Sequence, residues 1–285
     1  MPTAMHKQIE HYLRTGEYDQ DCLAWPGEGF FARARHGHAA LLEALIAEVH
    51  QRTQGATMPE PLIGMDVAAF TRAKVAPMVC GLFPQGEREA VLGMLSRSVV
   101  FLVPANIDSV LRESRWLHTA WKLANLYLAS FGPGLLSDEA PLLVGLSEGT
   151  TCYVSADHFR EKDPFADFVA HEAAHIFHNC KRETLGLRKI RGRDWLLEVG
   201  FAKREMFAYA CEAYSRIQAL GKGRADRRRL LSELGQASPP PDDRVDADEY
   251  IDILREAIEA RNGWKRILER CHDRRPMRRH HLGAD

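Results

Sequence analysis

The sequence lacks the paired cysteines, long apolar runs and charge imbalance that would each point to a broad class of protein. Its six cysteines include no CxxC pair, so neither a cysteine-based zinc site nor a disulfide framework is indicated. No apolar run approaches the roughly 20 residues that cross a bilayer, and residues 1–10 lack the pattern of a secretory signal. We therefore expect a cytoplasmic protein with no membrane partner.

A formal net charge of −1 gives no overall attraction to nucleic acid. Basic residues do cluster locally. They are Lys181, Arg182, Arg188, Lys189, Arg191, Arg193, residues 227–229 and a tail at 274–281. Such clusters attract acidic substrates or nucleic acid in some proteins, but no aromatic residues are interleaved with these charges. We therefore expect solvated loops and no nucleic-acid partner.

Hydrophobic periodicity predicts an α+β chain that is predominantly helical. Helices are expected at residues 5–15, 30–52, 66–82, 87–96, 107–131, 163–181, 195–220 and 248–271. Apolar runs at 99–103, 141–146 and 150–156 predict a small mixed sheet of about three strands. Asp163 is expected to cap the helix at 163–181, with Pro164 as its first helical residue.

Three consecutive regions follow from this pattern. A helical region covers residues 1–97, and a mixed core covers 98–220. The last region, 221–285, holds a helix and the basic tail, and the Pro-rich residues 239–241 mark a linker within it.

The stretch HEAAHIFH at residues 171–178 carries the strongest chemical signal. His171 and His175 share one helix face, about 5–6 Å apart at Cβ, so their imidazoles can take adjacent corners of a tetrahedral Zn²⁺ site. Glu172 is turned aside by one residue and can act as the general base on a metal-activated water. The alternative is an amphipathic helix with some polar residues. The apolar residues around the motif, however, predict that this helix is buried. Buried imidazoles and carboxylates need partners, which a metal would supply.

A catalytic zinc ion needs a third protein ligand, and the helix predicted at 195–220 offers three glutamates. Glu205 has Phe201, Ala202, Ala208 and Tyr209 one turn away on either side. A carboxylate in such apolar surroundings is costly unless it is paired or bound to metal. Glu212 and Glu198 lie seven residues from Glu205, on nearly the same stripe. We rank Glu205 first, Glu212 second and Glu198 last.

HExxH followed by Glu205-Met206-Phe207-Ala208 on a second helix resembles the gluzincin branch of the zinc metallopeptidases. The second-helix pattern is similar to the Glu-x-Phe-Ala run of lethal-factor-type toxins. The resemblance covers about residues 99–220 and implies a zincin-like core: small sheet, backing helix, HExxH helix and Glu-bearing helix. It also implies that the strand at 150–156 is an edge that pairs with an extended substrate. An edge strand without that role is the alternative.

Further residues close to these positions have candidate roles beside the metal, and for Tyr209 the role is one that the resemblance implies. Tyr209 either directs its hydroxyl at a developing oxyanion or is a buried aromatic with its hydroxyl satisfied. His178 is either an outer partner of His175 or a satisfied histidine, and we favour the second. Asp167, one turn before His171, is a candidate to orient that imidazole. Cys180 and Cys211 are assigned no role.

Two classes of function remain. The first is a zinc-dependent metallopeptidase acting on a peptide or protein, or the same metal centre hydrolysing a non-peptide substrate. The second is a non-catalytic, zincin-like protein that binds a partner protein or nucleic acid. The sequence makes no prediction of oligomeric state.

Overall fold

The structure is a computed structural model that describes residues 3–190 and 193–272. Arg191 and the basic tail at 274–281 lie outside these ranges. The chain divides into two compact units. The first holds the residues up to 74 together with 95–164, and the second holds 75–94 together with the described residues from 165 onward. This division cuts across the regions 1–97, 98–220 and 221–285 expected from the sequence.

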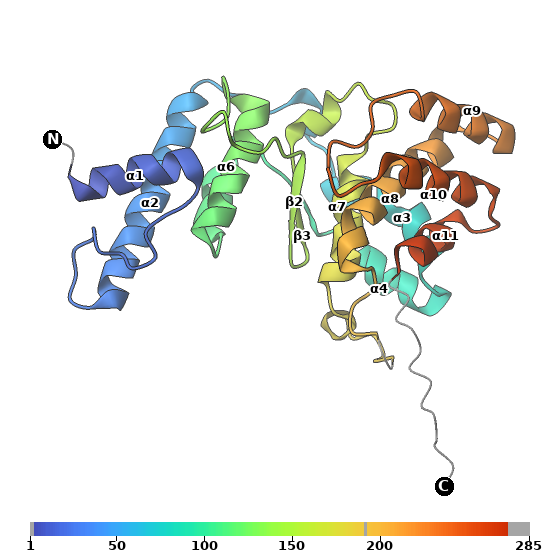
Figure 1. Ribbon diagram of the computed structural model, residues 1–285, viewed down its shortest axis with the longest axis horizontal. Coiled ribbons are helices and arrows are strands. Elements are labelled where there is room, and N and C mark those ends of the chain that lie inside the picture. Colours follow the sequence, from blue (N-terminus) through green and yellow to red (C-terminus); the bar gives the residue numbers. More distant parts are fainter. Residues whose placement is uncertain (1–2, 191–192, 273–285) are drawn as a thin grey trace, which may run out of the picture. The chain divides into compact units, whose positions relative to one another are not determined.

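The predicted α+β, predominantly helical class is confirmed, and the sheet has three strands (Figure 1). The first unit contains α1 (Ala4–Thr15), α2 (Phe30–Arg52), β1 (Val99–Phe101), α5 (Ile107–Glu113), α6 (Leu117–Phe131), β2 (Gly145–Glu148) and β3 (Thr151–Val154). The second contains α7 (Phe168–Asn179), α8 (Arg204–Leu220), α9 (Arg224–Leu234), α10 (Ala247–Glu259) and α11 (Gly263–Cys271). Helices α3 (Val67–Leu82) and α4 (Gln85–Leu95) cross the boundary between the units.

The sheet has the strand order β1–β3–β2, with β1 parallel and β2 antiparallel to β3. Val99 pairs with Cys152 across the first ladder, and Gly145 pairs with Val154 across the second. The expectation that residues 150–156 form an edge strand is therefore wrong. Because β3 has a neighbour on both sides, its backbone groups are engaged within the sheet and cannot receive an added peptide strand.

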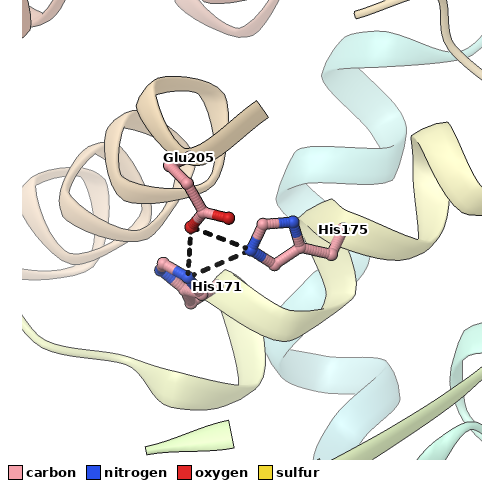
Figure 2. Close-up of side chains that lie close together, drawn as sticks. All are labelled: His171, His175 and Glu205. Atoms are coloured by element: carbon pink, nitrogen blue, oxygen red, sulfur yellow. Dashed lines mark hydrogen bonds and ion pairs between the residues drawn. The ribbon is translucent and has the colours of Figure 1, made fainter. Parts of the chain in front are cut away.

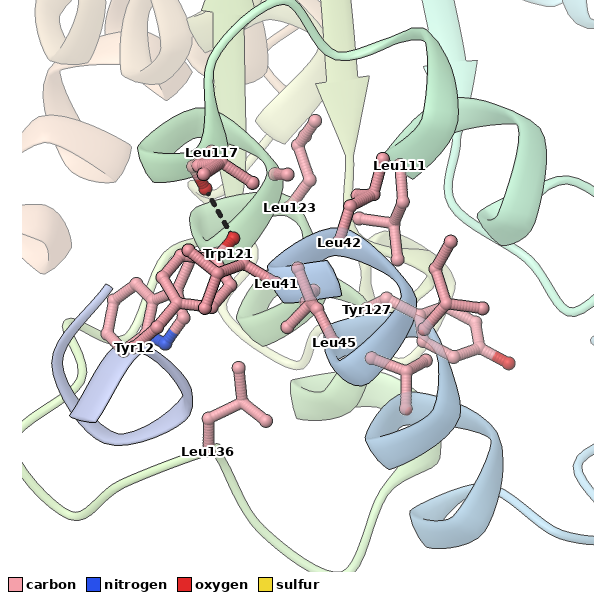
Figure 3. Packing of buried hydrophobic residues seen from close by; sticks show 14 of the residues in the cluster. Tyr12, Leu41, Leu42, Leu45, Leu111, Leu117, Trp121, Leu123, Tyr127 and Leu136 are labelled. Carbon is pink, nitrogen blue, oxygen red and sulfur yellow. Dashed lines mark hydrogen bonds between the residues drawn. The ribbon is translucent and has the colours of Figure 1, made fainter. Parts of the chain in front are cut away.

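The core of the first unit forms where α1, α2 and α6 meet (Figure 3). Tyr12 is completely buried and its hydroxyl donates to the carbonyl of Leu117 at 2.7 Å. The indole of Trp121 donates to the carbonyl of Leu13 at 2.9 Å. Gly16 ends α1 in a left-handed conformation with φ of 73°. A Cβ there would also lie 2.8 Å from the Trp121 ring, so glycine suits this position on both counts.

Three predicted helices are shorter than expected, and in two of them a polar side chain caps the helix inside the predicted range. Helix α7 begins at Phe168, where Asp167 accepts a hydrogen bond from the Ala170 N–H, so Asp163 is not its cap. The helix expected at 195–220 begins only at Arg204, after a short 3₁₀ turn at Phe201–Lys203. The helix expected at 248–271 is two helices, because Asn262 caps α11.

In the second unit α8 packs against α7, α10 and α11. This arrangement places α8 in the interior, as its run of apolar residues from Met206 to Cys211 predicts. Within the described ranges, every helix is too short or too polar to cross a membrane.

Candidate metal centre

Helix α7 presents His171 and His175 on one face, as their spacing predicts. Their Nε2 atoms lie 3.2 Å apart. Both rings are largely enclosed, with side-chain exposures of 7% for His171 and 12% for His175. Two imidazole nitrogens this close together in a poorly solvated place are positioned to share a cation.

Glu205 meets these two nitrogens from the first turn of α8 (Figure 2). Its Oε2 atom lies 3.4 Å from Nε2 of His175 and 3.8 Å from Nε2 of His171. Burial acts to raise the pKa of Glu205, but the adjacent His175 and His171, together with Arg244, bring that pKa below its usual value. The carboxylate is therefore ionised, as a metal ligand must be.

The three donor atoms fit the face of a zinc tetrahedron. Ligand distances of about 2.0–2.1 Å around a tetrahedral ion require donor atoms about 3.4 Å apart. The three observed separations are 3.2, 3.4 and 3.8 Å. Two imidazole nitrogens and one carboxylate oxygen also form a common donor set of catalytic zinc.

The other two glutamates proposed as ligands lie elsewhere. Glu198 accepts hydrogen bonds from the N–H groups of Asp194 and Trp195, at 3.0 and 3.3 Å, and so closes a turn before α8. Glu212 is buried two turns after Glu205, and its Oε2 lies 3.0 Å from Nδ1 of His171.

Glu212 fixes both the orientation of the His171 ring and the start of α7. Since a carboxylate can only accept, Nδ1 of His171 donates to it, and Nε2 is the ring nitrogen that faces His175 and Glu205. The other oxygen of Glu212 accepts the N–H of Asp167 at 2.7 Å. The carboxylate that orients His171 is thus Glu212, whereas the side chain of Asp167, the residue expected there, caps α7.

Burial alone would lower the pKa of His171. The hydrogen bond and charge of Glu212, with the charges of Glu172 and Glu205, instead raise it to about 9. A surplus of carboxylates around the ring favours positive charge at this point, so at neutral pH His171 carries a proton on both nitrogens, and Nε2 would have to lose its proton before it could hold a metal.

His178 performs the corresponding task for His175. Its Nε2 lies 3.1 Å from Nδ1 of His175, and its Nδ1 lies 3.1 Å from Oδ1 of Asn179. Burial, followed by the charges of His175 and Arg204, lowers the pKa of His178 to about 3. A neutral His178 that donates from Nδ1 to Asn179 can accept a hydrogen bond at Nε2 from the Nδ1–H of His175, and Nε2 of His175 then faces His171 and Glu205. His178 is thus buried with both ring nitrogens hydrogen-bonded, as expected of a satisfied histidine, and one of these bonds is to His175.

Glu172 and Tyr209 lie beside the cluster. Glu172 is 4% exposed, and its negative charge contributes to raising the pKa of both His171 and Tyr209. The Tyr209 ring packs edge-on against the His171 ring, with 4.5 Å between centroids. Burial, and then four carboxylates including Glu212 and Asp242, raise the pKa of Tyr209. Its hydroxyl therefore stays protonated and can donate a hydrogen bond.

Two residues of the site were not predicted from the sequence. Arg244 pairs with Glu205, and Asp242 pairs with Arg244, at 3.1 and 2.6 Å respectively. Both follow the Pro-rich residues 239–241, which were interpreted as a linker. An Asp and an Arg two residues apart after three prolines give no sequence signal of a partner on α8.

The basic loop that joins α7 to α8 is not uniformly solvated. Arg182 is 3% exposed and forms a bidentate ion pair with Glu87 of α4. Its Nη2 and Nη1 atoms lie 2.5 and 3.2 Å from the two carboxylate oxygens. Lys189 is exposed and pairs with Glu183. The loop thus contributes a buried structural cation, Arg182, to the second unit.

Comparison with known proteins identifies no matching family model, no matching curated protein and no matching solved structure.

Proposed function

We propose that the protein is a zinc-dependent metallopeptidase with His171, His175 and Glu205 as metal ligands. The observation that carries the proposal is the convergence of two Nε2 atoms and one carboxylate oxygen at separations of 3.2–3.8 Å. The outer partners Glu212 and His178 support it, because each accepts a hydrogen bond from Nδ1 of a proposed ligand histidine. The zincin-like core implied by the sequence resemblance belongs to the same proposal.

Zinc bound to these three residues would supply Lewis acidity that lowers the pKa of a water molecule to about 7. Glu172 would take a proton from the attacking water, whose oxygen bonds to the carbonyl carbon, and would deliver that proton to the amide nitrogen as the C–N bond breaks. Tyr209 donates a hydrogen bond from its hydroxyl toward the carbonyl oxygen as negative charge develops there. Glu212 and His178 keep the ligand imidazoles in the required tautomers.

A zinc hydrolase of a non-peptide substrate is the second candidate. One observation favours it: β3 is the central strand of its sheet, so the expected pairing of an extended peptide with this strand does not occur. The proposal of a peptide substrate then has two supports, the sequence resemblance and the set of donor atoms. A cytoplasmic location is also part of the proposal, since the six cysteines, all free thiols, suit a reducing compartment.

Metal analysis combined with a cleavage screen tests the proposed function. The purified full chain should carry about one equivalent of zinc, and it should cleave members of a peptide library. Cleavage should stop on chelation and return when zinc is restored. Zinc binding without peptide cleavage, followed by turnover in a panel of ester and amide substrates, would favour the non-peptide hydrolase. Absence of zinc, with a melting temperature unchanged by chelators, would favour the binding protein.

A further inference from the structure

The two oxygens of Glu205 have different partners. Oε2 faces the imidazole nitrogens of His175 and His171. Oε1 forms an ion pair with Nη2 of Arg244 at 3.1 Å. Arg244 comes from the segment between α9 and α10, which lies outside the part of the chain that resembles metallopeptidases.

Arg244 is itself held in place by Asp242. The Arg244 Nε donates to one oxygen of Asp242 at 2.9 Å, and Nη2 donates to the other at 2.6 Å. The same carboxylate accepts the backbone N–H of Arg244 at 2.9 Å. One aspartate therefore fixes both the main chain and the guanidinium, in the bidentate geometry that is characteristic of arginine.

The segment beyond Arg244 is anchored to the same helices. Val245 is buried, and Asp246 caps α10 by accepting the N–H of Glu249 at 2.8 Å. Glu249 in turn pairs with Lys203, the residue that precedes α8. The segment that carries Arg244 is thus fixed near Glu205, because the start of α10 is tied to the start of α8 through the Glu249–Lys203 pair.

We propose that Arg244 is a positioning residue that occupies Oε1 of Glu205, so that the carboxylate offers a metal only Oε2. A carboxylate can bind a metal through one oxygen or both. With both, it would take up the position that a catalytic zinc site keeps open for water. A guanidinium on Oε1 opposes that mode and holds the carboxylate in one orientation. This inference rests on the proposed function and adds the Asp242–Arg244 pair to it.

If the Arg244–Glu205 contact were only a surface ion pair, removing Arg244 would leave zinc binding unchanged. The Arg244 side chain is 67% exposed, and exposed pairs contribute little to stability because water and salt screen them. Removing Arg244 should therefore leave the stability of the zinc-free fold nearly unchanged. An effect on metal binding and coordination would then come from the contact with Glu205.

The test compares Arg244→Gln, Arg244→Lys and Asp242→Asn in the full chain. Arg228→Gln is the matched control, since Arg228 is 60% exposed and forms a bidentate pair with Glu259, which is not a residue of the site. Zinc affinity is measured by competition with a chromophoric chelator. Visible absorption of the cobalt-loaded protein reports coordination number, because four-coordinate cobalt absorbs more strongly than five- or six-coordinate cobalt. The melting temperature of each zinc-free protein reports its fold.

Arg244→Gln should weaken zinc binding by about 10-fold to 100-fold, the range for residues that hold metal ligands, and should weaken the cobalt absorption. Asp242→Asn should have a smaller effect in the same direction. Arg244→Lys should restore part of the affinity, and Arg228→Gln should match the parent protein. Unchanged zinc affinity and an unchanged cobalt spectrum in Arg244→Gln would overturn this inference alone. Failure of the parent protein to bind zinc would overturn the proposed function as well.

Discussion

Nδ1 of His171 lies 3.0 Å from Oε2 of Glu212, so a carboxylate on α8 orients an imidazole on α7. The other oxygen of Glu212 accepts the N–H of Asp167, the cap of α7. One buried side chain thus fixes both the start of the HExxH helix and the orientation of the His171 ring.

Glu212→Gln should weaken zinc binding by about 10-fold, because the amide loses the negative charge that strengthens the His171 hydrogen bond. Competition with a chelator measures the change. Glu233→Gln provides the control, since Glu233 is half exposed and pairs with Arg229 on its own helix. Equal zinc affinity in the Glu212 and Glu233 variants would remove Glu212 from the metal centre.

His171→Ala and Glu205→Ala should abolish stoichiometric zinc binding, since each leaves two of the three protein ligands. In the parent protein, free zinc at 100 times the dissociation constant should stabilise the fold by about 2.7 kcal/mol. That corresponds to a rise in melting temperature of roughly 5–10 °C. Neither variant should show the rise. A full zinc-dependent shift in Glu205→Ala would show that another group completes the site.

Glu172→Gln should retain zinc but lose turnover by a factor of about 10²–10⁴, the usual contribution of a general base. The amide is close in shape to the carboxylate, so the fold and the ligand histidines should be preserved. Glu183→Gln is the control, because Glu183 is exposed and pairs with Lys189. Turnover in Glu172→Gln close to that of the parent would assign the proton transfer to a different residue.

The HExxH half of the site could be predicted from the sequence because its geometry is local. Residues four apart on a helix must share a face, and neither packing nor long-range contacts can alter that. The choice between Glu205 and Glu212 could not be made in this way. Seven residues amount to nearly two turns, so the two side chains differ in direction by only about 20°. The structure uses both, with Glu205 toward the imidazole Nε2 atoms and Glu212 behind His171.

Contacts between residues far apart in the chain could not be predicted from the sequence. The central position of β3 depends on pairing with β1, which lies some fifty residues earlier in the chain, and the strand pattern does not specify its neighbours. Arg244 belongs to a segment whose prolines indicate a linker, and only the packing of α10 brings it to Glu205. Arg182 could not be distinguished from the other cations of its loop.

Arg182→Ala should destabilise the second unit by about 3 kcal/mol, because it leaves the Glu87 carboxylate without its cation at a mostly buried position. Chemical denaturation measures the loss. Arg229→Ala removes an exposed pair between residues four apart and should cost no more than about 0.5 kcal/mol. Similar small losses in both variants would mean that the Arg182 pair is as well solvated as a surface pair.

Tyr209→Phe tests whether the hydroxyl takes part in the reaction. Phenylalanine keeps the edge-on contact with the His171 ring, so zinc affinity and melting temperature should be preserved. If the hydroxyl stabilises developing negative charge, kcat should fall by about 10²-fold, the typical loss for one oxyanion donor, with little change in KM. Tyr214→Phe on the same helix is the control, because that hydroxyl donates to the carbonyl of Ala257. A normal kcat combined with a lowered melting temperature would make Tyr209 a packing residue whose hydroxyl is satisfied within the fold.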